Sequence, residues 1–364
     1  MIRTARDVGA PLSFGYTDRM ADAPRPKLRW FQFSLRSLML FVTACAVACS
    51  WLAVTIQGQR RQGAAVDAIE NVGGWVNSEP TWLGTLLRDD SLVTVTFVGL
   101  SQASVTDAWL AHLQGLSQLQ TIYLNDTHVS NAGLAHLQGL SQLQFLSLAN
   151  TQVTDAGLVN LQRLSQLQTL CLGNTQVADA GLVHLQGLNQ LQKLWLYDTQ
   201  VTDAGLVNLQ GLSQLQFLSL GNTQVTDAGM AQLQGLSQLQ ELYLSDTKVT
   251  DAGLVRLQGL RQLKNLSLAE IQVTDAGLVH LRRLSQLQEL YLSDTKVTDA
   301  GLVHLQELKQ LQWLHLSNTK VTDAGLVNLQ GLGQLQWLEL KGTKVTDRGV
   351  KKLQQALPNC KIER

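Results

Sequence analysis

The chain has 364 residues, and its 28 Lys and Arg balance 28 Asp and Glu, so the formal net charge is zero. Leu and Gln recur at fixed spacing and 29 Gly stand against 5 Pro, a composition typical of a repeat protein. Residues 1–36 carry seven basic and three acidic side chains, which leaves 21 basic and 25 acidic ones beyond them. The main body lacks the positive charge of a nucleic-acid-binding protein, so we expect no nucleic acid among its partners.

Residues 37–56 form a run of twenty residues without charge, long enough to cross a bilayer core as one helix. Basic residues and the aromatic residues Trp30, Phe31 and Phe33 precede the run, whereas Arg60 and Arg61 are the basic residues that follow it. The positive-inside rule then places the N-terminus in the cytoplasm. We predict a basic cytoplasmic tail (residues 1–36) and a transmembrane signal anchor (residues 37–56). The protein would cross the cytoplasmic membrane once, with its repeats on the extracytoplasmic side.

Three other interpretations of this apolar run stay open. A cleaved signal peptide has a similar apolar core, although the 36 residues before the run make a long leader. Residues 46–49 (Ala-Val-Ala-Cys) resemble a bacterial lipoprotein processing box, which would place a lipid on Cys49. A buried helix of a soluble protein is also apolar, but the basic and aromatic flanks favour a membrane interface.

The leucines reveal a strict 24-residue period. Ten units begin at Leu119 and at every twenty-fourth residue up to Leu335, and a weaker unit begins at Val95, so residues 95–358 are predicted to hold eleven repeats. Each approximates L-Q-x-L-x-L-x-x-T-x-V-T-D-A-G-L-x-x-L-Q-G-L-x-Q, and position numbers refer to this unit. Positions 4 and 6 alternate as in a strand, whereas positions 16 and 19 have helical spacing. Each unit is therefore predicted to be one strand followed by one short helix.

Several positions of the unit have an expected structural role. No unit can bury its own apolar face, so stacking must turn positions 1, 4, 6, 11, 16, 19 and 22 into continuous apolar ladders. Thr and Asp at positions 12 and 13 suit a helix start, and we assign the Asp row to helix capping. Gly at position 15, as in Gly157 and Gly301, lowers helix propensity and predicts close packing between neighbouring helices. Thr at position 9 is expected to bond the turn backbone.

The motif LxxLxL with a polar residue at position 9 resembles the strand signature of the leucine-rich repeat family. The following VTDAGL is similar to the ITDxGL of the ribonuclease-inhibitor-like and cysteine-containing subclasses, with Thr at position 9 in place of their Asn or Cys. The basic RWFQFSLRSL segment joined to such repeats resembles bacterial membrane-anchored envelope proteins. The resemblance implies an α/β solenoid in the form of a curved horseshoe. Its parallel strands would lie on the concave side and its helices on the convex side, and it would serve mainly in protein recognition.

The ends of such a solenoid must be sealed from water. Residues 57–94 are predicted to form an N-terminal cap, with one helix over residues 64–72 that stops at Gly73 and a second short helix that starts at residues 78–80. At the other end Pro358 should break the last helix. Residues 359–364 are predicted to form a closing strand.

Strand alternation also predicts a binding surface. Because positions 4 and 6 point inward, positions 3, 5 and 7 line the concave face. Ten of the eleven aromatic residues in the repeats occupy these positions, among them Phe97, and Trp109 is the exception. We expect these rings to stay substantially exposed within a polar rim, as at protein interfaces. The candidate partner-binding residues are Tyr123, Phe145, Lys193, Trp195, Tyr197, Phe217, Glu241, Tyr243, Glu289, Tyr291, Trp313, His315 and Trp337.

The function predicted from these features is a membrane-anchored scaffold that recognises a protein partner through its concave face. Two other interpretations of the aromatic residues stay open. In the first, aromatic residues occur here because they favour strands and stack across neighbouring strands, which serves stability alone. In the second, the aromatic rings pack against the sugars of a cell-wall polysaccharide. A structural or adhesive envelope protein, which self-associates or holds wall polysaccharide, is therefore the alternative function.

We expect no enzymatic activity, no cofactor and no metal. The sequence contains no GxxxxGK[ST], HExxH or CxxC motif. Histidines at position 18, such as His280 and His304, share their place with Asn on the polar helix face, and a metal site there would lack its other ligands. Cys171 and Cys360 would lie roughly 38 Å apart across eight strands, too far for a disulfide. An intracellular ubiquitin-ligase adaptor would need a recruiting domain, and residues 1–94 contain none that we recognise.

Overall fold

The computed structural model describes residues 34–364 of the chain, which fall into two units that meet between Ala53 and Val54. Helix α1 (Leu35–Asn71) begins in the first unit and ends in the second, and the second unit holds the rest of the chain. The predicted basic tail, residues 1–36, lies outside the described residues except for its last three.

Helix α1 contains the apolar run over residues 37–56. Within the described residues it is the one helix long and apolar enough to cross a membrane, and none of its most apolar stretch is buried. A membrane span and a signal sequence both fit these properties. The helix continues without a break into the helix expected over residues 64–72, because no Pro interrupts the connection and its Gln and Arg residues favour a helix. Ala65 and Ile69 in its last turns are buried in the apolar core.

The segment after α1 contains a strand where the sequence predicts the start of a helix. Residues 78–80 end strand β1 (Trp75–Pro80), which pairs antiparallel with β2 (Val93–Gly99). Helix α2 (Trp82–Leu87) follows, and Thr81 caps it by accepting a hydrogen bond from the backbone N of Gly84 at 3.1 Å. The predicted helix start at residues 78–80 is therefore wrong, because the local capping group is Thr81 and the paired strand uses the residues before it.

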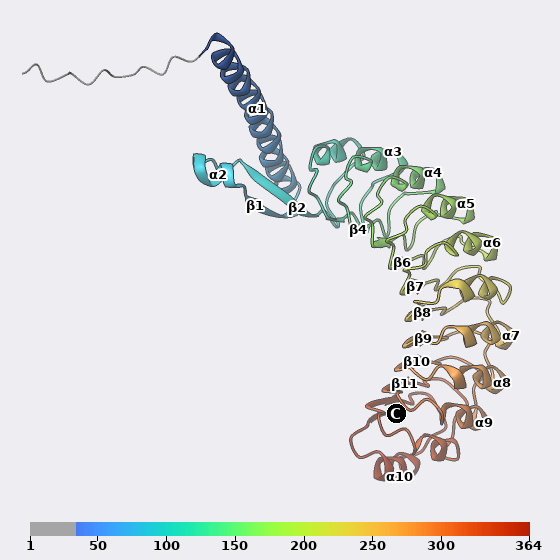
Figure 1. Ribbon diagram of the computed structural model, residues 1–364. Helices are drawn as coiled ribbons and strands as arrows, with labels where there is room; N and C mark the ends of the chain where they lie inside the picture. The colour runs from blue at the N-terminus through green and yellow to red at the C-terminus, as the bar shows by residue number, and fades with distance from the viewer. Residues whose placement is uncertain (1–33) are drawn as a thin grey trace, which may run out of the picture. The chain divides into compact units, whose positions relative to one another are not determined.

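The repeats form one curved sheet. The described residues contain a 13-stranded sheet in chain order, and each pair from β2 to β13 is parallel. Equivalent residues pair, so Ile122 lies opposite Leu146, and Leu146 lies opposite Leu170. The strands line the inside of an arc and the helices line its outside (Figure 1). The remaining strands are β3 (Thr121–Tyr123), β4 (Phe145–Ser147), β5 (Thr169–Cys171), β6 (Lys193–Trp195), β7 (Phe217–Ser219), β8 (Glu241–Tyr243), β9 (Asn265–Ser267), β10 (Glu289–Tyr291), β11 (Trp313–His315), β12 (Trp337–Glu339) and β13 (Lys361–Glu363).

The helical part of most repeats is one α-helical turn followed by a 3-10 turn. The α-helices are α3 (Asn131–Leu134), α4 (Asp155–Leu158), α5 (Asp179–Leu182), α6 (Asp203–Leu206), α7 (Asp251–Leu254), α8 (Asp275–Leu278), α9 (Asp299–Leu302) and the longer final helix α10 (Asp347–Ala356). The 3-10 helices are η1 (Ala108–Leu113), η2 (Ala135–Leu137), η3 (Val159–Leu161), η4 (Val183–Leu185), η5 (Val207–Leu209), η6 (Gly229–Gly235), η7 (Val255–Gly259), η8 (Val279–Arg283), η9 (Val303–Leu305) and η10 (Gly325–Leu329).

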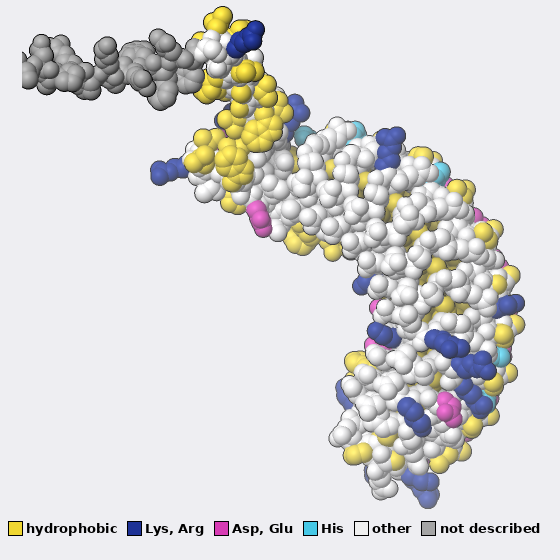
Figure 2. Space-filling view, viewed as in Figure 1, with side chains coloured by type: hydrophobic (Ala, Val, Ile, Leu, Met, Phe, Trp, Pro, Cys, Tyr) yellow, Lys and Arg dark blue, Asp and Glu magenta, His cyan; other side chains and the backbone are white. Residues whose placement is uncertain are grey.

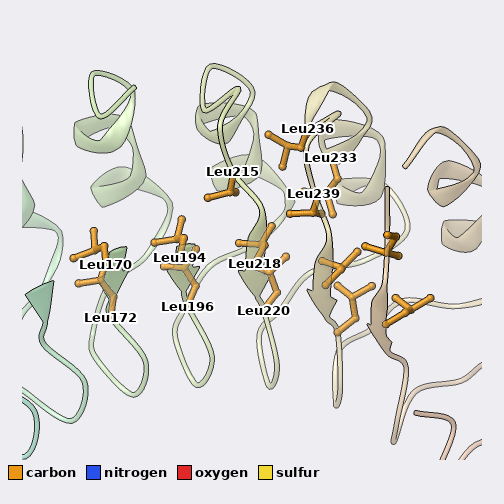
Figure 3. Packing of buried hydrophobic residues seen from close by; sticks show 14 of the residues in the cluster. Leu170, Leu172, Leu194, Leu196, Leu215, Leu218, Leu220, Leu233, Leu236 and Leu239 are labelled. Atoms are coloured by element: carbon orange, nitrogen blue, oxygen red, sulfur yellow. The ribbon is translucent and has the colours of Figure 1, made fainter. Parts of the chain in front are cut away.

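The core consists of the predicted apolar ladders. Leu170, Leu194 and Leu218 follow one another on successive strands and are fully buried (Figure 3). Leu215, Leu236 and Leu239 come from positions 1 and 22 and lie in the same core. Each buried leucine contributes about 1.5–3 kcal/mol relative to its exposure to water. The residues opposite it in the sheet belong to neighbouring repeats, so this contribution depends on the stacking of the repeats.

The aspartates at position 13 connect neighbouring repeats, although the sequence assigned them to helix capping. Asp251 Oδ1 accepts a hydrogen bond from the backbone N of Thr274 in the next repeat at 2.8 Å, and its Oδ2 accepts one from Thr274 Oγ1 at 2.6 Å. Thr274 caps its own helix by accepting from the backbone N of Ala276. Position 12 therefore supplies the cap, and position 13 bonds the next cap residue. The same pair of bonds is made by Asp107, Asp179, Asp203, Asp227, Asp275, Asp299 and Asp323.

Positions 8 and 9 make the turn that follows each strand. The hydroxyl of Thr151 donates to the carbonyl of Leu148 at 2.6 Å, as expected for position 9, and the other position 9 threonines do the same in their repeats. Position 8 adopts a left-handed backbone, with φ of 56° at Asn150 and 52° at Asp198. Asn and Asp tolerate this conformation better than other residues with a side chain, which explains why they dominate position 8.

We expect Asp251→Ala to lower the unfolding free energy by about 1–3 kcal/mol, because it leaves the amide and hydroxyl of Thr274 without their acceptor. Urea unfolding of the full chain in detergent, followed by circular dichroism, measures this loss. Glu307→Ala, at an exposed turn position, is the control and should change stability little. Equal stability of both variants and the native chain would contradict the bridging role of position 13.

The glycines of one repeat should differ in their tolerance of alanine. A Cβ on Gly181 would lie 2.5 Å from Asp155 Oδ1 and 3.0 Å from Leu158 Cδ1, both in the preceding repeat, whereas a Cβ on Gly187 would meet nothing within 4 Å. Gly181→Ala is therefore expected to destabilise the fold by about 1–3 kcal/mol. Gly187→Ala should be neutral or stabilise it by up to about 1 kcal/mol. The same unfolding assay tests both, and equal effects would refute close helix packing at position 15.

Candidate functional site

The concave face is built from the outward positions of each strand. In strand β6, Leu194 is buried between Lys193 and Trp195, which point away from the core. The parallel register repeats this arrangement, so Trp313 lies opposite Trp337, and His315 lies opposite Glu339. Strands β3, β4, β6, β7, β8, β10, β11 and β12 supply every predicted candidate residue except Tyr197, which follows β6 at position 7.

The aromatic rings on this face form three groups. The first group starts outside the repeats, at Trp75 of strand β1, which lies 4.6 Å from Phe97 between ring centroids. Phe97 lies 5.6 Å from Tyr123, and Tyr123 lies 4.5 Å from Phe145. Four strands therefore contribute one continuous row of tilted ring contacts, and Trp75 is a member that the sequence did not reveal because β1 was not predicted.

The second group lies in the middle of the sheet. Trp195 lies 4.2 Å from Phe217, and Phe217 lies 5.3 Å from Tyr243. The ring of Tyr197 instead lies over Gly173, where a Cβ would overlap it. The second group therefore contains three rings in tilted contact, and Tyr197 lies apart from them. Lys193 is exposed beside this group.

The third group lies near the C-terminal end. Trp313 and Trp337 stack with their centroids 6.4 Å apart, and Lys361 Nζ lies 4.1 Å from the Trp337 ring centroid. Next to them, Tyr291 stacks on His315 at 4.3 Å with 9° between the ring planes. His315 Nδ1 lies 2.7 Å from Glu339 Oε2, and an ionised carboxylate can only accept, so Nδ1 carries the proton. Glu339 and Lys361 were absent from the predicted site.

Contacts between neighbouring rings make the aromatic side chains less exposed than the sequence suggested. Nine of the ten aromatic side chains of the repeats on this face are half-buried, and Trp313 is the exception at 39% exposure. The expectation of substantial exposure is therefore wrong for most of them, because each ring covers part of its neighbour on the next strand. Within the described residues, His315 Nε2 and Ser317 Oγ are the buried side-chain polar atoms without a hydrogen-bond partner, and both lie on strand β11 or just after it.

The ionisable groups on this face have shifted pKa values with clear causes. Burial first, and then the nearby Glu289 carboxylate, raises the pKa of Tyr291 to about 12. Burial and Glu241 likewise raise the pKa of Tyr243. The hydrogen bond with His315 lowers the pKa of Glu339. Burial raises the pKa of the Cys171 thiol, which keeps it protonated at neutral pH and makes it a poor nucleophile.

The histidines considered as metal ligands in the sequence take part in contacts between repeats. His280 Nδ1 lies 3.0 Å from Gln258 Nε2, and His304 Nδ1 lies 2.6 Å from Arg282 Nη2, in each case with the partner one repeat earlier. Among residues 34–364, no group of three or more His, Cys, Asp or Glu side chains is arranged to hold a metal ion. The four cysteines are all free thiols, and Cys171 and Cys360 lie on or beside strands β5 and β13.

This arrangement of parallel strands inside and short helices outside, with leucines between them, is a leucine-rich repeat solenoid. The family described as "Leucine-rich repeat region" matches residues 100–362. The chain belongs to the leucine-rich repeat family. No curated protein matches the sequence significantly.

Solved bacterial structures share the fold. An internalin of Listeria monocytogenes is 20% identical, with a TM-score of 0.58 over 77% of this chain and 92% of the internalin chain. A leucine-rich repeat protein of Leptospira interrogans is also 20% identical, with a TM-score of 0.53 over 70% of this chain and 74% of its own. At this identity the likeness establishes the solenoid fold.

The pair formed by His315 and Glu339 should make stability depend on pH. Because the folded pKa of Glu339 is lowered, its contribution is complete above the unfolded value of about 4.3 and is lost as the pH falls through the folded value. Glu339→Gln should therefore be less stable than the native chain at neutral pH, and the difference should shrink toward pH 3. Urea unfolding across this range tests the prediction. A difference that does not change with pH would contradict it.

Proposed function

We propose that this protein is a membrane-anchored, non-enzymatic scaffold that binds a protein partner through its concave face. The observation that carries the proposal is the placement of ten aromatic side chains on one face of the repeats. The solenoid core needs none of them, because its buried residues are chiefly leucine and valine and none of them is aromatic. Aromatic side chains are enriched at the centres of protein interfaces and among the residues that contribute most to binding.

The third aromatic group gives the proposal its most specific support. Trp313 is the most exposed of the ten aromatic residues that the repeats place on this face, and it lies on the same strand as His315, whose Nε2 has no hydrogen-bond partner. Buried polar atoms are normally paired, so an unpaired one marks an unused bonding capacity. A partner that covers Trp313 would gain apolar contact there and would bring its own polar groups close to His315, Glu289 and Glu339.

We assign the parts of the chain to this function as follows. Residues 1–36 form a basic cytoplasmic tail, residues 37–56 anchor the protein in the cytoplasmic membrane, and residues 57–94 cap the solenoid. Residues 95–358 are the eleven repeats, and residues 359–364 close the sheet. Helix α1 supports the anchor by its length and apolar surface. The repeats would then face the extracytoplasmic side, where the partner is a protein of the envelope.

The proposal is tested by capture from an envelope extract with the full chain in detergent. The native chain is compared with a concave variant, Trp195→Ala, Tyr243→Ala and Trp313→Ala, which removes one or more rings from two of the three groups. The control variant, Val159→Ala, Val207→Ala and Val327→Ala, removes three exposed apolar side chains from the helical side. Circular dichroism establishes that both variants fold.

The native chain and the control variant are expected to retain a common protein that the concave variant loses. Loss of each buried aromatic contact should weaken binding by at least about 1 kcal/mol, so the triple change should weaken it more than a hundredfold. Equal capture by all three chains would mean that the rings stabilise the sheet only. Retention of polysaccharide in place of protein would support the adhesive alternative and exclude protein recognition as the main function.

A further inference from the structure

A second surface, on the helical side, differs sharply between repeats. The three repeats that begin at Leu239, Leu263 and Leu287 carry five cations at positions 18–23, whereas the six repeats before them carry one, Arg163, and the repeat after them carries none. The other residues of these repeats follow the common pattern closely, so the basic substitutions are a local feature. The five cations, all exposed, are Arg256, Arg261, Arg282, Arg283 and Lys309.

Contacts between repeats place these cations on one surface. Position 20 contacts position 18 of the next repeat, as shown by Arg282 Nη2, which lies 2.6 Å from His304 Nδ1. Position 23 reaches position 21 of the next repeat, because Lys309 Nζ lies 3.5 Å from the carbonyl of Gly331. By the same geometry Arg261 lies beside Arg283. Basic side chains gather on the outer side of the C-terminal repeats in Figure 2.

Exposed valines, which position 17 also supplies in other repeats, lie among the cations. Val255, Val279 and Val303 occupy position 17 of the same three repeats and are 42%, 40% and 41% exposed. Position 17 shares a surface with position 21, since the equivalent Val159 and Arg163 line one depression in an earlier repeat. Glu307 is the one acidic residue at positions 17–23 of the three repeats. These five cations and three valines are called the convex basic surface.

We propose that the convex basic surface binds the headgroup region of an anionic lipid bilayer. Arginine and lysine are attracted to lipid phosphates, and apolar side chains between them gain contact with the interface, as on interfacial helices. A water-soluble polyanion would match the cations and leave the valines in water, so the combination favours a lipid surface. A convex arc touches a flat surface over a few repeats, which agrees with the confinement of the cations to three. This proposal is independent of the concave face.

The experiment measures contact between the convex basic surface and lipid headgroups. A fluorophore is attached at Val279→Cys in the full chain, with Cys45, Cys49, Cys171 and Cys360 replaced by alanine. The labelled chain is mixed with lipid nanodiscs that contain nitroxide-bearing headgroups. One set consists of phosphatidylcholine, and the other also contains phosphatidylglycerol. The same label at Val183→Cys, position 17 of a repeat without basic residues at positions 18–23, is the positional control.

We expect the label at residue 279 to be quenched about twofold or more in the anionic discs, and the label at residue 183 to be unaffected. Arg256→Gln, Arg282→Gln and Arg283→Gln together should abolish this quenching. The matched removal of three exposed cations from the last helix, Arg348→Gln, Lys351→Gln and Lys352→Gln, should preserve it. Circular dichroism establishes that the labelled chains fold.

Three results would overturn the proposal. The first is the absence of quenching at residue 279, and the second is equal quenching in discs of phosphatidylcholine alone. The third concerns soluble polyphosphate added without discs. If it shifts the emission of the label as strongly as the anionic discs do, and the arginine variant abolishes that shift, the surface is a polyanion site rather than a lipid site.

Discussion

The apolar side chains of one 24-residue unit can leave water only against the units on either side. Leu146 is fully buried because Ile122 and Leu170 lie opposite it in the sheet and other ladder residues cover it. The stability of each repeat thus depends on its neighbours. The first and last repeats lack a neighbour on one side, so other segments must cover their apolar side chains. At one end Ala65 and Ile69 of α1 join the core, and strand β1 pairs with the first parallel strand. At the other end strand β13 closes the sheet.

Stacking also decides where functional variation can occur. The leucines, the position 9 threonines and the position 13 aspartates are committed to bonds or contacts within and between repeats. The side chains at positions 3, 5 and 7 point away from the core, so residues as different as Lys193, Trp195 and Glu241 can occupy these positions without altering the core. Because every strand is in register, these free positions combine into one continuous surface. Positions 17, 18, 20, 21 and 23 give the helical side a comparable freedom, and the cations of three repeats occupy four of them.

Much of the fold could be predicted from the sequence because it follows from the 24-residue period and from the pattern of apolar and polar residues within each unit. The leucine ladders, the position 9 hydrogen bond and the close approach at position 15 all depend on residue type at a fixed place in the unit. The role of Asp251 could not be predicted in the same way. Its acceptor position beside Thr274 depends on the offset between repeats, which no single unit contains. Strand β1 was missed because Trp75–Pro80 has no repeat to align with.

The sequence was sufficient to predict which face holds the candidate site, but not how its side chains contact one another. Alternation assigned the rings to the concave face, and the strand register made Trp313 and Trp337 neighbours. The half-buried state of most rings, the stacking of Tyr291 on His315 and the hydrogen bond to Glu339 depend on side-chain orientation across strands. Trp75 and Lys361 join the aromatic groups from outside the repeat pattern, so no periodicity could reveal them.

The most direct test of concave recognition is site-specific photo-crosslinking in intact cells. A photoreactive phenylalanine analogue replaces Phe217 in the central aromatic group in one chain and Val207 on the helical side in another. We expect a discrete protein adduct from position 217 and none from position 207. Adducts of the same protein from both positions, or from position 207 alone, would contradict it.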